Sequence, residues 1–272
     1  MQDPDRTILI TGATSGLGRA VAESLAARGG RLILHGRDPA RLQDVAAELQ
    51  PLNASIDVVT ADLSDLSQVD EMAEQIFELT DHLNVLVNNA GLGKGASDHR
   101  ETSSDGHELR LAINHLAPFA LTFRLLPLLE TGAPSRIVNV ASGAQEPIDF
   151  DDPHITEGYT GNRAYAQSKF AMVAAGFQLA NRLPAEVITV NSLHPATLMP
   201  TRMVREGYGH TVDDLDTGVD AVLRLIESAA LEDVTGQYFS IQQPAQAHPQ
   251  TYDPDVQQRL WDLTEKLTGI QF

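Results

Sequence analysis

Short runs of apolar and β-branched residues alternate along the chain with longer segments in which apolar residues recur at helical spacing. The apolar runs, which we expect to be strands, are TILIT (7–11), RLILH (31–35), IDVVT (56–60), NVLVN (84–88), RIVNV (136–140), EVITVNS (186–192) and QYFSI (237–241). Most of them are apolar throughout, as strands are when helices cover both faces of their sheet. The alternation therefore predicts an α/β fold, a doubly wound parallel sheet of seven strands with helices on both faces.

Length and composition predict a single domain over residues 1–272. The chain is 42% hydrophobic and has no internal repeat or low-complexity linker. Two segments, at about 143–162 and 195–216, break the alternation with Pro, Gly and acidic residues after predicted strands. Ligands bind at this carboxyl edge of open α/β sheets. We expect the two segments to wall or cover a substrate pocket, although a plain surface loop fits the acidic part of the first segment equally well.

The balance of charge argues against nucleic acid as a partner. With 37 Asp and Glu against 19 Lys and Arg, the formal charge of −18 repels phosphate backbones and anionic membranes. The most apolar long stretch, 116–130, contains two prolines and an arginine, which favours a buried helix over a membrane span. The N-terminus lacks the basic and apolar regions of a secretion signal, so we expect a cytoplasmic protein.

A glycine-rich run, TGATSGLG (11–18), joins the first predicted strand to the first predicted helix. In that position Gly12 permits a tight turn, Gly16 lets backbone approach a pyrophosphate, and Gly18 lets the helix pack close to the strand. We therefore predict that this loop binds the phosphates of a dinucleotide through the residues Gly12, Thr14, Ser15, Gly16, Leu17 and Gly18.

The end of the second strand, RLILHGRD, indicates which dinucleotide is bound. An NAD site usually has an acid there that accepts hydrogen bonds from the ribose, but this chain has Gly36 followed by Arg37. A guanidinium suits a 2′-phosphate, so NADP(H) is preferred and NAD(H) remains possible. Asp38 opens a DPARL pattern and is predicted to cap a helix instead. The alternative for Arg37 is an ordinary solvated side chain.

Further cofactor contacts are expected after the third and fourth strands. Asp62 and Leu63 follow the third strand, where the carboxylate could meet the adenine amino group. The run NNAG (88–91) ends the fourth strand with small residues that allow backbone to lie against the nucleoside. We assign Asn89, Ala90 and Gly91 to that surface, while a purely structural turn role for the asparagines is equally open.

The stretch RAYAQSKFA places Tyr165 and Lys169 one helical turn apart. A nearby cation favours phenolate, so we expect the ammonium to lower the pKa of the phenol from about 10. Such a pair makes an acid–base catalyst that donates a proton to a carbonyl oxygen and removes one from an alcohol. The alternative is an ordinary pair of helical surface residues.

Taken together, TGATSGLG, NNAG, Ser142 after RIVNVA, and YAQSK resemble the classical short-chain dehydrogenase/reductase family, which has a Rossmann fold. The motifs occur in the family's order over nearly the whole chain. The segments RIVNVAS, IDFDD, AYAQSK, SLHP, GQYFS and RLWDLTEKLTG are similar to the branch that contains the retinol dehydrogenases.

The resemblance implies a catalytic tetrad of Asn114, Ser142, Tyr165 and Lys169. Ser142 would stabilise charge on the substrate oxygen, Lys169 would also hold the nicotinamide ribose, and Asn114 would anchor a water that relays protons. It further implies that Pro195 and Leu198 lie beside the nicotinamide, that no metal is needed, and that the protein forms a homodimer or homotetramer through the helix that carries the tyrosine.

Two departures from the family pattern lie in HPATLMPT (194–201). Ala196 stands where a glycine is usual, and Thr201 lies one place beyond the common threonine, so we leave Thr201 outside the predicted site. Cysteine is absent and the histidines lack metal-ligand spacing, which agrees with the absence of a catalytic metal.

These observations predict an NADP(H)-preferring oxidoreductase that interconverts a carbonyl and an alcohol. An apolar, small-molecule substrate is expected because the second interrupting segment contributes Leu198, Met199, Met203, Val204 and Tyr208. Two alternatives remain open, namely an NAD-dependent alcohol dehydrogenase of the same fold and a dinucleotide sensor without turnover.

Overall fold

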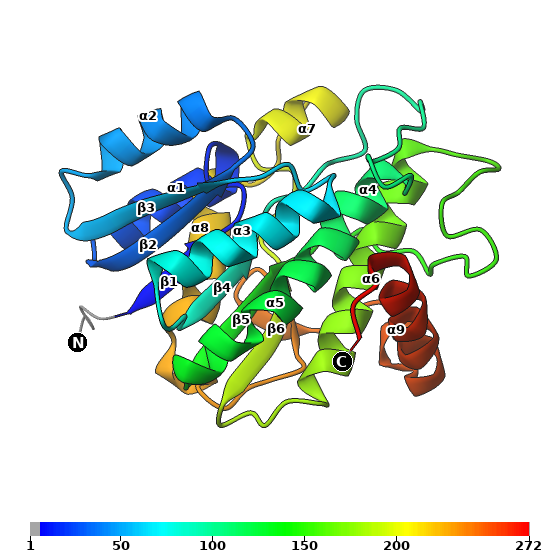
Figure 1. Ribbon diagram of the computed structural model, residues 1–272. Coiled ribbons are helices and arrows are strands. Elements are labelled where there is room, and N and C mark those ends of the chain that lie inside the picture. Colours follow the sequence, from blue (N-terminus) through cyan, green and yellow to red (C-terminus); the bar gives the residue numbers. More distant parts are fainter. Residues whose placement is uncertain (1–5, 272) are drawn as a thin grey trace.

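A single eight-stranded sheet lies at the centre of the computed structural model, which describes residues 6–271 (Figure 1). The strand order is β3-β2-β1-β4-β5-β6-β7-β8. The strands are β1 (Thr7–Ile10), β2 (Gly30–Gly36), β3 (Ala54–Thr60), β4 (Val85–Asn88), β5 (Ser135–Val140), β6 (Ile188–His194), β7 (Tyr238–Ser240) and β8 (Gln243–Ala245). The first seven pair in parallel, which confirms the predicted α/β fold.

The eighth strand was not predicted. Strand β8 pairs antiparallel with β7 at the sheet edge, after a tight turn in which Ile241 has φ 55°. Its three residues include Pro244. Proline has no N–H to donate, which is tolerated at a sheet edge because one side of an edge strand is unpaired. A three-residue strand of Gln, Pro and Ala has neither the length nor the β-branched residues that a sequence pattern would reveal.

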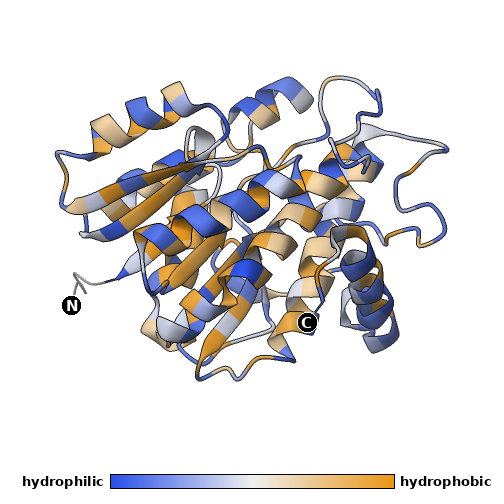
Figure 2. Ribbon diagram, viewed as in Figure 1, coloured by the Kyte–Doolittle hydropathy of each residue, from blue (hydrophilic) through white to orange (hydrophobic). Residues whose placement is uncertain are grey.

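The helices cover both faces of the sheet. They are α1 (Gly16–Ala26), α2 (Pro39–Leu49), α3 (Leu66–Leu79), α4 (Leu109–Leu111), the π-helical turn η1 (Ala112–Leu116), α5 (Ala117–Thr131), α6 (Gly161–Ala180), α7 (Arg202–Gly207), α8 (Leu215–Glu227), the 3₁₀ turns η2 (Ala229–Leu231) and η3 (Pro249–Tyr252), and α9 (Pro254–Thr268). Strand residues alternate between the two cores. In β1, Leu9 packs with α3, α5, α6 and α9, whereas Ile8 and Ile10 pack with α1, α2 and α8. Figure 2 shows the hydrophobic strands between these layers.

The order of the strands creates a crevice in the middle of the sheet. The chain enters at β1, moves outward to β2 and β3, and then returns to β4 on the other side of β1. The connections leave the carboxyl ends of β1 and β4 in opposite directions, and ligands of open α/β sheets bind at this point. The glycine-rich turn follows β1 at this position, as the sequence predicts.

One helical stretch, Leu109–Thr131, is long and apolar enough to cross a membrane by length and composition, but 83% of its most apolar window is buried inside the protein. It comprises α4, η1 and α5, and α5 packs against α3 and the sheet. This burial confirms the predicted core helix.

The C-terminal helix α9 covers part of α6 (Figure 1). Trp261 is 1% exposed and meets Phe119 of α5 edge-on, with ring centroids 5.2 Å apart. The guanidinium of Arg182, just beyond α6, lies 4.0 Å from the centre of the Trp261 ring, and Phe177 stacks on Tyr252. Helix α9 thus covers part of the helix through which the family resemblance implies a subunit contact.

Candidate active site

A cavity of about 690 Å³ opens at the carboxyl ends of the central strands. All the predicted site residues except Asn114 line it: Gly12, Thr14, Ser15, Gly16, Leu17, Gly18, Arg37, Asp62, Leu63, Asn89, Ala90, Gly91, Ser142, Tyr165, Lys169, Pro195 and Leu198. These residues come from seven separate segments of the chain. The fold thus brings the glycine-rich turn and the Tyr165–Lys169 pair to one connected space.

The glycine-rich turn has no room for side chains at two of its positions. Gly12 has φ 69°, and a Cβ there would lie 2.8 Å from the Cα of Ala90. A Cβ on Gly18 would overlap the carbonyl oxygen of Gly12 and the side-chain nitrogen of Asn89. These contacts hold the start of α1 against β1 and β4, as predicted for Gly18.

Gly18→Ala tests this close approach. The added methyl must displace Asn89 or the Gly12 carbonyl, so we expect a lower melting temperature and at least about tenfold weaker dinucleotide binding. Thermal unfolding and a fluorescence titration with NADPH measure both effects. Ala22→Gly, which lies one turn along the same helix, is the control, because it should destabilise α1 without weakening NADPH binding to the same extent.

The N-terminus of α1 faces the cavity without a capping side chain. Ser15 is the N-cap residue, but its hydroxyl makes no cap hydrogen bond. The first N–H groups of a helix lack intrahelical partners and favour an anion. The loop therefore suits a pyrophosphate both by shape and by charge.

His35 holds the glycine-rich turn by a hydrogen bond to its backbone, a role that the sequence did not reveal. Its side chain is 2% exposed, and Nδ1 accepts a hydrogen bond from the N–H of Gly12 at 3.3 Å. Nε2 lies 3.1 Å from the carbonyl oxygen of Ala61, so it carries the proton. Burial lowers the pKa of His35, which keeps the ring neutral in this arrangement.

The end of β2 has no room for the acidic side chain that is usual there in NAD sites. A Cβ on Gly36 would overlap the methyl group of Thr14, so a carboxylate there would have to displace that side chain. Arg37 extends into solvent at the cavity edge with 74% of its side chain exposed, 3.9 Å from a carboxylate oxygen of Asp62. Asp38 caps α2 by accepting from the N–H groups of Ala40 and Arg41, as predicted.

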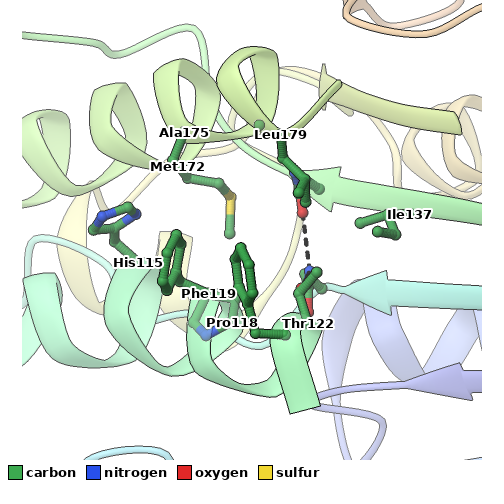
Figure 3. Close-up of a pocket in the computed structure, with 12 residues that line it drawn as sticks. His115, Pro118, Phe119, Thr122, Ile137, Met172, Ala175 and Leu179 are labelled. Carbon is green, nitrogen blue, oxygen red and sulfur yellow. Dashed lines mark hydrogen bonds between the residues drawn. The ribbon is translucent and has the colours of Figure 1, made fainter. Parts of the chain in front are cut away.

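Asn88 and Asn89 have different roles. Asn88 is 2% exposed and donates to the side chains of Asn139 (2.9 Å) and Thr122 (3.2 Å). It borders a separate cavity of about 30 Å³, enough for one water, into which Met172 points from α6 (Figure 3). Asn88 therefore has the structural role that the sequence left open, whereas Asn89 lines the large cavity.

Asn114 lies behind the cavity wall, in the π-helical turn η1. Its side chain accepts from the N–H of Leu92 at 2.7 Å and donates to the carbonyl of Leu92 (3.0 Å) and to the hydroxyl of Ser168 (2.9 Å). A Cβ on Gly91 would lie 3.2 Å from Oδ1 of Asn114 and 3.5 Å from Nζ of Lys169. Asn114 thus fixes the wall at Leu92 and lies next to Lys169.

Ser142 and Tyr165 both line the cavity, and Ser142 interacts with the phenol closely enough to affect its pKa. Ser142 follows β5 and is held on both sides, because its hydroxyl accepts from the N–H of Ala144 and its carbonyl accepts from the hydroxyl of Tyr238. Tyr165 reaches it from the second turn of α6.

The predicted lowering of the Tyr165 pKa is wrong for this structure. Burial raises the pKa of the phenol, and the hydrogen bond from Ser142 only partly opposes that effect. Lys169 is 3% exposed and donates to the carbonyl of Val140 at 2.8 Å. Burial lowers the pKa of its ammonium to about 8. In the free protein the lysine is therefore engaged with backbone and does not activate the phenol.

The family comparison agrees with this geometry. Residues 6–209 match the family model described as short chain dehydrogenase. The chain belongs to the short-chain dehydrogenase family. Retinol dehydrogenase 13 from Homo sapiens is 35% identical over 289 residues, which cover 98% of this chain and 86% of that protein. This match confirms the predicted similarity to the retinol dehydrogenase branch.

Solved structures show the same architecture. A protein from Mycobacterium paratuberculosis superposes with a TM-score of 0.79 at 29% identity, over 98% of this chain and 94% of that one. A protein from Shigella flexneri 2a, crystallised as a complex with NADP, superposes with a TM-score of 0.72 at 27% identity, over 89% of this chain and all of that one.

Thr201, which we left outside the predicted site, lines the cavity of this short-chain dehydrogenase. Its hydroxyl accepts from the N–H of Val204 and caps α7, and its methyl group would lie 3.2 Å from a Cβ on Gly16. The turn from Pro200 into α7 brings this threonine to the cavity. The sequence position of Thr201, one place beyond the common threonine, could not show this.

Among residues 6–271, no group of three or more His, Asp or Glu side chains is arranged to hold a metal ion.

Proposed function

We propose that this chain interconverts a carbonyl and an alcohol by hydride transfer with NADP(H), with Tyr165 as the general acid and base. The observation that supports it most is that Ser142, Tyr165 and Lys169 line one cavity together with the glycine-rich turn, with Lys169 one turn along the same helix as Tyr165. When bound, the nicotinamide supplies the hydride chemistry.

The protein residues would move the proton and stabilise charge. In reduction Tyr165 donates its proton to the carbonyl oxygen while Ser142 donates a second hydrogen bond to the same atom. Because burial raises the pKa of Tyr165, the hydroxyl is protonated at neutral pH, as an acid must be. Oxidation would require the phenol to lose its proton to solvent first, after which the phenolate oxygen would accept the proton of the alcohol. Lys169 and the N-terminus of α1 would hold the ribose and the pyrophosphate.

The direct test is to measure turnover of a panel of carbonyl compounds and alcohols by the change in absorbance of the reduced nicotinamide. We expect turnover with NADPH or NADP⁺. Saturable binding of NADPH without turnover of any compound would favour the alternative of a catalytically silent dinucleotide sensor.

NADP(H) is proposed over NAD(H) because an NAD site usually has an acidic residue at the end of the second strand. This chain has Gly36 there, followed by the guanidinium of Arg37. The Shigella flexneri relative, crystallised with NADP, supports this choice. Asp62 lies 3.9 Å from the guanidinium and would share it with a 2′-phosphate.

Arg37→Ala is expected to lower kcat/KM for NADPH by about 10- to 100-fold and to leave kcat/KM for NADH within about threefold. A hydrogen-bonded charge pair contributes about 1.5–3 kcal/mol, and only NADPH presents the phosphate. Steady-state kinetics with both cofactors measure the ratio, with Arg41→Ala on the next turn as a control. A variant whose use of NADPH is unchanged would overturn the cofactor assignment made from Arg37, and a wild type that prefers NADH would favour the alternative, an NAD-dependent alcohol dehydrogenase.

The proposed substrate has an apolar body. The walls beyond Ser142 are formed by Leu198, Met199, Met203 and Val204, and a Cβ on Gly93 would lie 2.5 Å from Cγ of Met203, so α7 packs closely on the opposite wall. The relative named retinol dehydrogenase 13 acts, by its name, on a long apolar alcohol, which is consistent with such walls.

A further inference from the structure

Lys94 is a cation in the cavity that the proposed cofactor does not explain. Four cationic side chains line the space, namely those of Arg37, Lys94, Lys169 and Arg202. The first and third are assigned to the cofactor, and Arg202 pairs with Glu206 at 2.6 Å. Although the chain has 37 acidic residues, no carboxylate within residues 6–271 lies within ion-pair distance of Lys94.

The backbone of Lys94 is held in a fixed place by a buried charge. Nη2 of Arg110 donates to the carbonyl of Lys94 and Nε donates to that of Gly93, both at 2.8 Å. Arg110 is 2% exposed, lies 3.4 Å from Glu108, and donates to the hydroxyl of Tyr159 at 2.6 Å. Moving Arg110 would leave its buried charge without these partners, at a high cost in free energy. The cavity wall at Gly93 and Lys94 is therefore held in place.

The first residue of α6, Gly161, lies directly against the backbone carbonyl of Lys94. A Cβ on Gly161 would overlap the oxygen of Lys94, so the wall and the start of the helix that carries Tyr165 are in direct contact. The stem of the lysine runs along α7, since a Cβ on Gly207 would lie 3.2 Å from its Cγ.

The ammonium of Lys94 faces the ring of Tyr208, and both residues line the cavity. Nζ is 4.7 Å from the centre of the Tyr208 ring, an arrangement that attracts a cation to the ring face without neutralising it. Tyr208 is in turn close enough to Tyr165 to raise the pKa of that phenol. Lys94, Tyr208 and Tyr165 all line the same cavity.

We propose that Lys94 binds an anionic group of the substrate, so that the preferred substrates are carbonyl compounds or alcohols with an apolar body and a carboxylate. This assignment rests on the proposed function of the same cavity. An ammonium that extends from a fixed backbone segment and has no protein carboxylate as a partner gains a charge-assisted hydrogen bond from such a group, while the apolar walls accept the body.

Matched pairs of substrates test the assignment. Each pair consists of an oxo-carboxylate and its methyl ester with the same skeleton, in a series of increasing chain length. For the wild type we expect kcat/KM to favour the carboxylate by at least tenfold at one chain length. Lys94→Met, which keeps the length of the stem, should reduce that ratio to about one, and Lys94→Arg should retain it.

Lys266→Met provides the matched control. The chain has only three lysines, and Lys266 is exposed on α9, away from the cavity, so its removal should leave the carboxylate-to-ester ratio unchanged. The melting temperature of Lys94→Met shows that the variant is folded before the ratios are compared.

A binding measurement separates this inference from the proposed function. The quenching of bound NADPH fluorescence gives the Kd of each carboxylate and ester whether or not turnover occurs. Tighter binding of the carboxylate that is lost in Lys94→Met supports the role of Lys94 even if no compound is reduced. An equal ratio in the wild type and Lys94→Met overturns it, and so does a Lys94→Met variant that loses NADPH affinity and keeps the ratio, because the lysine would then belong to the cofactor site.

Discussion

Tyr165→Phe is expected to lower kcat for carbonyl reduction by about 10²- to 10⁴-fold, the usual contribution of a positioned general acid. The substitution removes one hydroxyl and keeps the ring that lines the cavity. Ser142 keeps its hydrogen bond from the N–H of Ala144. Because most of the proposed NADPH contacts lie at the glycine-rich turn and at Arg37, we expect the Kd for NADPH to change by less than about threefold.

The measurement combines single-turnover absorbance of NADPH with a fluorescence titration of cofactor binding. Tyr252→Phe is a suitable control, since Tyr252 is 40% exposed and its hydroxyl accepts only from the N–H of Ala247. A Tyr165→Phe enzyme with more than a tenth of the wild-type rate would show that another group delivers the proton.

The features predicted well from sequence are those that depend on local patterns. The seven parallel strands follow from uninterrupted apolar runs, and the cap of α2 follows from Asp38 and Pro39, which are neighbours in the chain. The glycine-rich turn was recognisable because its three glycines lie within seven residues. Strand β8 was missed because its residues carry no such pattern and the strand exists only by pairing with β7.

The features that sequence could not predict depend on contacts between distant segments. His35 holds Gly12 from the next strand, and Arg110 holds Lys94 across 16 residues, so neither role is visible in a motif. The spacing of Tyr165 and Lys169 was read correctly as one helical turn. The direction of the phenol pKa was not, because it depends on burial, and the lysine donates instead to the carbonyl of Val140 in β5.

Lys169→Met is expected to abolish turnover while making the cofactor-free protein more stable at pH 7. Activity should fall by at least about 10²-fold, since the ammonium that would hold the ribose is lost. Stability should rise because the wild type keeps a charge at a site that is 3% exposed, with one backbone carbonyl as its partner. A gain of about 1–2 kcal/mol is expected after the loss of the hydrogen bond to Val140.

The pH dependence of this gain follows from the lowered pKa. Lys169 titrates near 8 in the folded protein and near 10.5 when unfolded, so between these values the unfolded chain binds more protons and wild-type stability rises with pH. The advantage of Lys169→Met should therefore be largest at pH 7 and shrink between pH 8 and 9.5. Urea unfolding at several pH values, with Lys266→Met for comparison, measures the difference. An advantage that stays constant with pH would mean that the lysine is not the source of the strain, and a loss of stability at pH 7 would show that its hydrogen bond outweighs the cost of burying its charge.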